Sequence, residues 1–204
     1  MTDRSGDFPI VDASGCIRPG RREDLDDVVR IHTRELVSRL TDLGPRIVKR
    51  FYANVLERGI GRLSVGLDEG RVAGFVFSAE RVDVLFKNAL LAGPADAVRF
   101  VFDSRKRALP AFLATSLRWK TEKSALDVPE LVYLAVDRDR RQTGLGGRLI
   151  GAAEKYFQDL GAEFYELSVI EKNPAVVFYR KRGFTVTQRL ILGSTAVLRM
   201  RRRF

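Results

Sequence analysis

One stretch, residues 131–160, constrains the fold more than any other part of the chain. Its first six residues, Leu131–Val136, are apolar or aromatic and rich in strand formers, which predicts a strand buried on both faces. Charged residues end this strand, and a glycine turn follows at 144–147. Apolar residues then recur at helical spacing until Gly161. The sequence therefore predicts a strand followed by a helix that begins inside the glycines.

The glycine turn has the properties of an anion site. Backbone N–H groups in the first turn of a helix lack intrahelical partners and carry partial positive charge, and glycines let an anion approach them. Arg141 and its basic neighbours add positive charge. The P-loop is excluded because its Gly-Lys-Ser/Thr ending is missing, and the dinucleotide fingerprint because Leu149 replaces its last glycine. The remaining pattern, Arg-x-x-Gly-x-Gly at 141–146, predicts a phosphate or pyrophosphate site.

Two segments of the chain resemble the GNAT N-acyltransferase superfamily. The hexapeptide Arg-Gln-Thr-Gly-Leu-Gly at 141–146 resembles the loop that holds the pyrophosphate of acyl-CoA in that superfamily. Residues 167–184 resemble its next block, which consists of a strand, an asparagine, a short helix, a tyrosine and Gly-Phe. The resemblance is close from Glu130 to about Phe184 and elsewhere covers only the order of elements.

The resemblance implies an α/β fold of the GNAT type, with a mixed central sheet splayed between strands 4 and 5 to admit the pantetheine arm. These strands are the ones at 131–136 and 163–170. A single domain is expected over 1–204, with a loose tail at 1–13 and a helical insertion at 81–129 before strand 4. The other elements are predicted at 15–18, 62–67, 72–79, 184–192 and 195–203 for strands, and at 21–37, 41–56 and 174–182 for helices.

Acetyl-CoA is the co-substrate that the resemblance implies. Amides near the end of strand 4 are expected to polarise the thioester carbonyl, and Asn173 to bind the pantetheine, although capping of the next helix explains Asn173 equally well. The cofactor-binding residues expected by resemblance are Leu134, Ala135, Val136, Arg141, Gln142, Thr143, Gly144, Leu145, Gly146, Gly147 and Asn173.

Acyl transfer to an amine also requires groups that move protons. The amine must lose a proton and the departing thiolate must gain one. Tyr179 lies where the resembling family often has its general acid, and its alternative role is that of a core aromatic. Glu130 is the first candidate for the base, acting through water, unless it is a solvated loop carboxylate. Tyr133, Glu166 and His32 are alternatives for the base.

The insertion at 81–129 is rich in apolar residues. It is therefore expected to pack on the body, on another subunit or around an acceptor. We interpret part of it as a lid or wall for an acceptor larger than a free amino acid.

Composition limits the remaining classes of function. The net charge of +10 suggests nucleic-acid binding. The aromatic residues do not interleave with the basic ones, however, and the arginines at 199–203 are expected to form a solvated strand end. Nucleic-acid binding is therefore not the expected function. No uncharged apolar run approaches the roughly 18 residues of a membrane span, and no signal pattern opens the chain, so a cytoplasmic protein without membrane contact is expected. With one Cys and one His, neither an internal disulfide nor a structural metal is expected.

Two functions of different class follow. The first is an N-acetyltransferase that moves an acetyl group directly from acetyl-CoA to the primary amine of a small molecule, such as an amino sugar or a biosynthetic intermediate. The second is a non-catalytic acyl-CoA-binding domain that acts as a sensor or assembly partner. The acid at Tyr179 favours the enzyme, because a pure binder has little need of it. Protein acetylation is a weaker third function, and a homodimer is left open.

Overall fold

The computed structural model describes residues 16–82, 128–192 and 194–204. Most of the predicted tail (1–13) and insertion (81–129) lies outside these residues. The elements are β1 (Ile17–Pro19), η1 (Arg22–Asp24), α1 (Leu25–Glu35), α2 (Arg39–Asp42), α3 (Pro45–Arg58), β2 (Arg62–Asp68), β3 (Arg71–Ala79), β4 (Glu130–Val136), η3 (Arg138–Arg140), α7 (Leu145–Asp159), β5 (Phe164–Ile170), α8 (Ala175–Lys181), β6 (Thr185–Leu192) and β7 (Thr195–Arg203).

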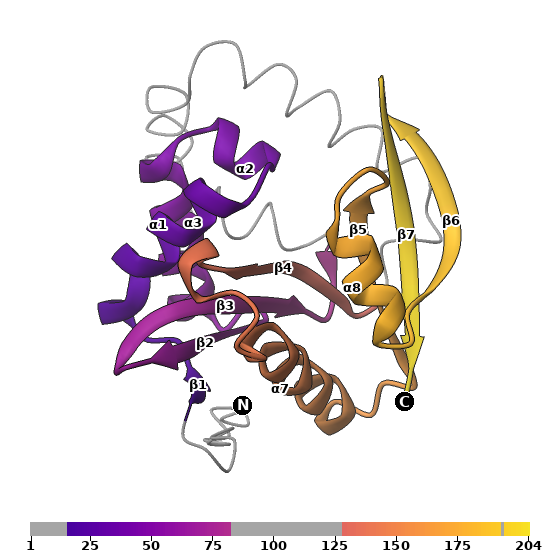
Figure 1. Cartoon of the computed structure of the whole chain (residues 1–204). Coiled ribbons are helices and arrows are strands. Elements are labelled where there is room, and N and C mark those ends of the chain that lie inside the picture. The colour runs from indigo at the N-terminus through magenta and orange to yellow at the C-terminus, as the bar shows by residue number, and fades with distance from the viewer. Residues whose placement is uncertain (1–15, 83–127, 193) are drawn as a thin grey trace.

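The strands form one seven-stranded sheet in the order β1-β2-β3-β4-β5-β7-β6 (Figure 1). Every neighbouring pair is antiparallel except β4 and β5, which are parallel. These two strands share the single register pair Glu130↔Glu166, whereas β3 and β4 pair along most of their length. Because β4 and β5 separate beyond Glu130, the sheet is split, which confirms the predicted splay.

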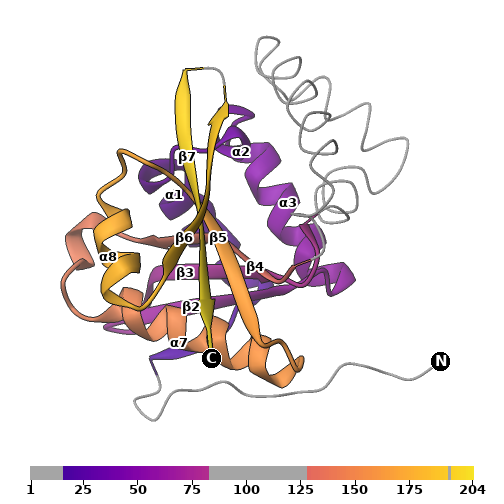
Figure 2. The same ribbon diagram turned by 90° about the vertical axis from the view of Figure 1, so that its right-hand side faces the viewer.

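Two helical layers cover the sheet. Helices α1 and α3 lie against one face, and α7 and α8 against the other (Figure 2). The side chains of a strand alternate between faces, so each layer has its own core. After the roles that the resemblance implies for them, we call the side covered by α1 and α3 the acceptor face and the side covered by α7 and α8 the cofactor face. The largest fully buried residues include Phe51, Tyr52, Phe75 and Phe77 on the acceptor face and Phe157 and Tyr165 on the cofactor face.

The helix predicted at 41–56 is in fact two helices, α2 and α3. The Ser38 side chain accepts a hydrogen bond from the Thr41 amide and caps α2. Gly44 then turns the chain with a φ of 96°, and Pro45 occupies the first position of α3. The prediction was wrong because apolar residues at helical spacing show which face of a segment is buried. They do not reveal a turn between two helices that bury the same face.

Strand β4 carries a bulge next to the split. Phe77 pairs with Tyr133 and Ser78 with Leu131, so Val132 is an extra residue. Leu131 and Ala135 are buried, but residues 132–134 are only partly so. The prediction of burial on both faces is therefore wrong for the middle of the strand, where β5 has moved away.

Candidate active site

The turn before α7 presents a run of unbonded amides. Gly144 has a φ of 81° and Gln142 a φ of 67°, which turn the chain sharply into the helix. The first amides to bond are those of Gly147 and Arg148, which donate to the Gly144 carbonyl at 3.0 and 3.2 Å. Within the described residues, the amides of 142–146 donate to no backbone carbonyl. The amides of Leu145 and Gly146 lie in the first turn of α7, and those of 142–144 lie just before it. Unbonded amides at a helix N-terminus are suited to bind an anion, and we call the amides of 142–146 the amide cradle.

The glycines of this turn also bring α8 close to α7. A Cβ atom on Gly146 would lie 3.4 Å from the ring of Phe178 and 3.7 Å from Val136, and one on Gly147 would overlap the Arg182 guanidinium. That guanidinium lies over the Phe178 ring, 4.7 Å from its centroid. An apolar wall made by Val136 and Phe178 therefore runs from the amide cradle to the end of β4.

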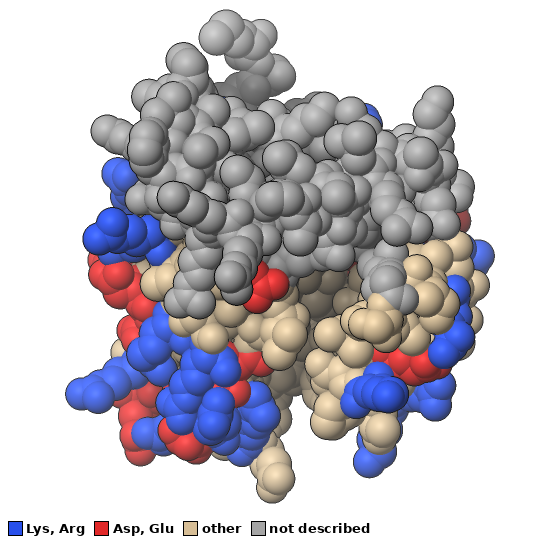
Figure 3. Space-filling model, turned by 90° about the horizontal axis from the view of Figure 1, so that it is seen from above, with Lys and Arg blue, Asp and Glu red and all other residues tan. Residues whose placement is uncertain are grey.

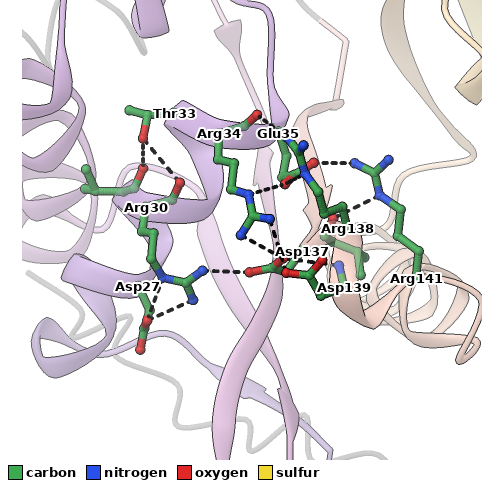
Figure 4. Close-up of polar contacts among 11 residues, drawn as sticks. Asp27, Arg30, Thr33, Arg34, Glu35, Asp137, Arg138, Asp139 and Arg141 are labelled. Carbon is green, nitrogen blue, oxygen red and sulfur yellow. Dashed lines mark hydrogen bonds and ion pairs between the residues drawn. The ribbon is translucent and has the colours of Figure 1, made fainter.

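Glu35 of α1 engages two basic residues of the turn, Arg138 and Arg141 (Figure 4). Arg141 Nη2 lies 2.6 Å from Glu35, and its Nε donates to the Val136 carbonyl at 3.3 Å. Arg138 Nε lies 3.0 Å from the other oxygen of Glu35. The Glu35 side chain is only 4% exposed. Arg141 thus ties the turn to α1, and the positive potential of the cradle comes chiefly from its amides.

A carboxylate of the turn itself also pairs with α1. Asp137 accepts from the Asp139 amide, which caps η3, and lies 2.6 Å from Arg30 and 3.5 Å from Arg34. The bond from Arg30 holds the pKa of Asp137 below its ordinary value. Arg140 pairs with the β2–β3 turn. These ion pairs connect the predicted phosphate turn to both neighbouring elements.

On the acceptor face, buried charges lie where β4 and β5 part. Glu130 is 5% exposed, and its carboxylate lies 3.3 Å from both Arg199 Nη2 and Ser168 Oγ. Arg199 also donates to Glu166, which accepts from Arg201 at 2.8 Å. Desolvation raises the pKa of Glu130, although Arg199 and Ser168 oppose that shift. Glu130 is therefore a buried strand residue, and its interpretation as a solvated loop carboxylate is wrong.

The prediction of a solvated arginine strand end was also wrong at one position. Arg199 is 3% exposed, because alternation along β7 places it opposite Ser168 and beside Glu166. The sequence signal for this cluster was the spacing by two of Arg199 and Arg201 on β7 and of Glu166 and Ser168 on β5. This spacing places each pair on one face of its strand.

Comparisons with known proteins agree with this geometry. The model of the acetyltransferase (GNAT) family matches residues 25–184. This chain belongs to the GNAT acetyltransferase family. No individually curated protein matches it.

Solved structures resemble the fold at low sequence identity. Ribosomal-protein-alanine N-acetyltransferase from Brucella melitensis is 15% identical, with 92% of this chain and 99% of that chain covered and a TM-score of 0.60. PaiA N-acetyltransferase from Thermoplasma acidophilum, in complex with coenzyme A, is 14% identical (92% and 98% covered, TM-score 0.59). YncA from Salmonella typhimurium, with acetyl-CoA, is 13% identical (92% and 92% covered, TM-score 0.56).

The tyrosine expected as the general acid of this GNAT chain lies on α8. Tyr179 is 8% exposed and contacts Phe178 and Phe184, each with a ring-centroid distance of 5.5 Å. No described residue forms a hydrogen bond with its hydroxyl, and burial raises the pKa of Tyr179 to about 12. A phenol with this pKa keeps its proton at neutral pH and can donate it. Its role as the acid stays a prediction.

Asn173 precedes α8 and caps it. Its Oδ1 accepts from the Ala175 amide at 2.9 Å. The structure thus shows the capping interpretation, and pantetheine binding by Asn173 stays a prediction.

Figure 3 shows the surface that includes α1, the 137–141 turn and α8. Basic and acidic side chains gather there over α1 and the 137–141 turn, and a hollow separates them from α8.

In the described part of the chain, no group of three or more His, Cys, Asp or Glu side chains could hold a metal ion. None of the described helices is long and apolar enough to span a membrane.

Proposed function

We propose that this GNAT protein transfers an acetyl group directly from acetyl-CoA to the primary amine of a small molecule. The observation that carries the proposal is the amide cradle at 142–146, which leads along an apolar wall to the split between β4 and β5. Two structures of the same fold are described with acetyl-CoA and with coenzyme A. A cytoplasmic location and a homodimer stay predictions from the sequence.

In the proposed complex the cradle amides bind the diphosphate, helped by Arg141. The pantetheine arm passes between α7 and α8 into the split. Amides of residues 134–136 on the open side of β4 polarise the thioester carbonyl, because β5 has moved away and supplies no strand partner there.

Two bond changes at the carbonyl carbon and two proton transfers complete the transfer. The amine nitrogen bonds to the carbonyl carbon, and the bond from that carbon to sulfur breaks. The Tyr179 proton goes to the departing sulfur, and the amine proton goes to Glu130. Burial keeps Tyr179 protonated at neutral pH, and it makes Glu130 a stronger base than an exposed carboxylate.

A thiol-trapping assay of coenzyme A release, run over a panel of amino sugars, polyamines and amino acids, tests the proposal. We expect turnover with at least one amine and a loss of kcat of about 100-fold in Tyr179→Phe, with the KM for acetyl-CoA unchanged. Tyr156→Phe is the matched control, because Tyr156 lies on α7 and hydrogen-bonds Glu80. Acetyl-CoA binding by calorimetry without turnover on any amine would favour the non-catalytic alternative.

A further inference from the structure

A groove lies between α8 and the outer edge of the sheet. It has a volume of about 550 Å³ and is bordered by α8, by the loop before α8 and by β6 and β7. Val176, Val177 and Arg180 of α8 line it, whereas Phe178 and Arg182 lie against the first turn of α7. Successive residues of a helix are roughly 100° apart, so these two sets occupy opposite faces of α8. The helix therefore separates the groove from the amide cradle.

Exposed apolar side chains lie in the groove or next to it. Val177 and Val186 line it, and they are 57% and 41% exposed. Ile191 is 57% exposed and lies two residues after Arg189, which lines the groove, so both point to the same face of β6. These are three of the six large apolar residues that are exposed among the described ones. Such a gathering on one face is typical of an interaction site.

The charged residues of the groove leave a positive balance. Arg189 donates to Glu171 through Nε and Nη2, both at 2.8 Å, so this pair is neutral. Lys172 and Arg180 also line the groove, and neither forms an ion pair with a described residue. One precedes α8 and the other lies near its C-terminal end, so the two cations stand at opposite ends of the groove. Charge therefore favours an acidic occupant over a second copy of this chain, whose net charge is +10.

Strand β6 lies at the edge of the sheet, beside the groove (Figure 1). The described residues include no strand that pairs with its outer side. An edge strand can pair with an extended segment of another protein, whose side chains then alternate between the two faces of the sheet. Among the described residues that line the groove none is aromatic, which disfavours the stacking of nucleic-acid bases. An extended polypeptide fits this surface better.

We propose that the groove and the edge of β6 bind an extended acidic segment of a partner protein. The segment pairs with β6, lays an apolar side chain against Val177 and Val186, and brings a carboxylate to each of Lys172 and Arg180. These cations flank α8, whose seven residues span about 10 Å. Acids four residues apart on a strand lie about 13 Å apart, within reach of both cations. The segment thus has the pattern acid–x–apolar–x–acid, which puts all three side chains on one face.

The test uses the full chain and a capped, fluorescein-labelled nonapeptide, Thr-Thr-Glu-Thr-Val-Thr-Glu-Thr-Thr. Fluorescence anisotropy should show saturable binding with a Kd below about 1 mM. One control peptide has glutamine at both glutamate positions. The other, Glu-Glu-Val-Thr-Thr-Thr-Thr-Thr-Thr, keeps the charge and composition but not the spacing. Each control should bind about 10-fold more weakly or worse.

Variants of the protein locate the site. Arg180→Glu should weaken binding about 10-fold, whereas Arg71→Glu, the same charge change at the exposed start of β3, should weaken it less than twofold. Val177→Ser should weaken binding about threefold, and Val37→Ser, at a position that is 89% exposed, should leave it unchanged. All four side chains are exposed, so the variants should fold.

Hydrogen exchange tests the strand pairing separately. The amides of 185–192 should exchange more slowly when the glutamate peptide is bound, because those on the outer side of β6 gain hydrogen-bond partners. Unchanged exchange in this strand at saturating peptide would overturn the proposal.

Other outcomes would also overturn it. These are the absence of saturable binding, equal binding of the three peptides, and equal losses in Arg180→Glu and Arg71→Glu. A nine-nucleotide single-stranded DNA that binds more tightly than the peptide, and loses affinity in Arg180→Glu, would assign the groove to nucleic acid. A wild-type dimer in sedimentation equilibrium that dissociates in Arg180→Glu would assign it to a second copy. None of these results depends on acetyl transfer, so the proposed function is tested independently.

Discussion

The two faces of the split sheet are built in different ways. On the cofactor face, the cradle is made of consecutive amides from 142–146, and glycines set its shape. On the acceptor face, the buried groups come from separate elements: His32 from α1, Glu130 from β4 and Arg199 from β7. A site made of backbone leaves a short local pattern in the sequence. A site made of distant side chains leaves at most a period-two spacing within each strand, which does not identify the partner strand.

The largest expected effect tests the buried charges of the acceptor face. Arg199→Met removes the cation between Glu130 and Glu166 and leaves two buried carboxylates facing each other, so the free energy of unfolding should fall by about 3–5 kcal/mol. Arg203→Met, at an exposed position of the same strand, is the control and should change it by less than about 1 kcal/mol. Urea denaturation measures both. An equal effect of the two variants would contradict a charge cluster specific to this face.

The next prediction tests the amide cradle. Gly146→Asp should fold, because its Cβ has room beside Phe178 and an acid suits the first turn of a helix. Its carboxylate should repel the diphosphate and weaken acetyl-CoA binding by about 100-fold, or about 2.7 kcal/mol. Calorimetry measures this, with Gly151→Asp as the control, since Gly151 lies in α7 with open space around it. Unchanged affinity in Gly146→Asp would place the diphosphate elsewhere.

A third prediction uses the only histidine of the chain. The pKa of His32 is about 3 in the folded protein and 6.5 in its ordinary environment, so the unfolded state binds a proton first as the pH falls. The His32 contribution to the free energy of unfolding is therefore complete above pH 6.5 and is lost at about 1.4 kcal/mol per pH unit below it. Nitrogen NMR of the imidazole should show a neutral ring down to about pH 4.5. Titration of the His32 imidazole near pH 6.5 would contradict its complete burial.

The smallest effect returns to the cofactor face. Because Arg141 is half exposed and paired with Glu35, Arg141→Gln should weaken acetyl-CoA binding only about threefold, or about 0.7 kcal/mol. Arg71→Gln, on the exposed start of β3, is the charge-matched control. If Arg141→Gln proved as damaging as Gly146→Asp, the amides would no longer be the principal binding groups, and the contrast between the two faces would weaken.

The same contrast explains what the sequence could predict. The strand, turn and helix from 130 to 160 depend on local pattern, and β7 was predicted with the bounds that the structure has. Side-chain partners distant in sequence had no such signal, so the pairing of Glu35 with Arg141 and the burial of Arg199 were missed. The division of 41–56 into α2 and α3 was missed because both helices bury one continuous stripe.

Because β4 and β5 share a single register pair, the sheet consists of two smaller sheets that are joined only at Glu130 and Glu166. An extended thioester arm lying in the open seam would act as a substitute strand, offering polar groups to amides that no neighbouring strand reaches. Ligand binding and completion of the sheet would then be one event. Thermal stability should rise with acyl-carrier concentration through the closing of this seam.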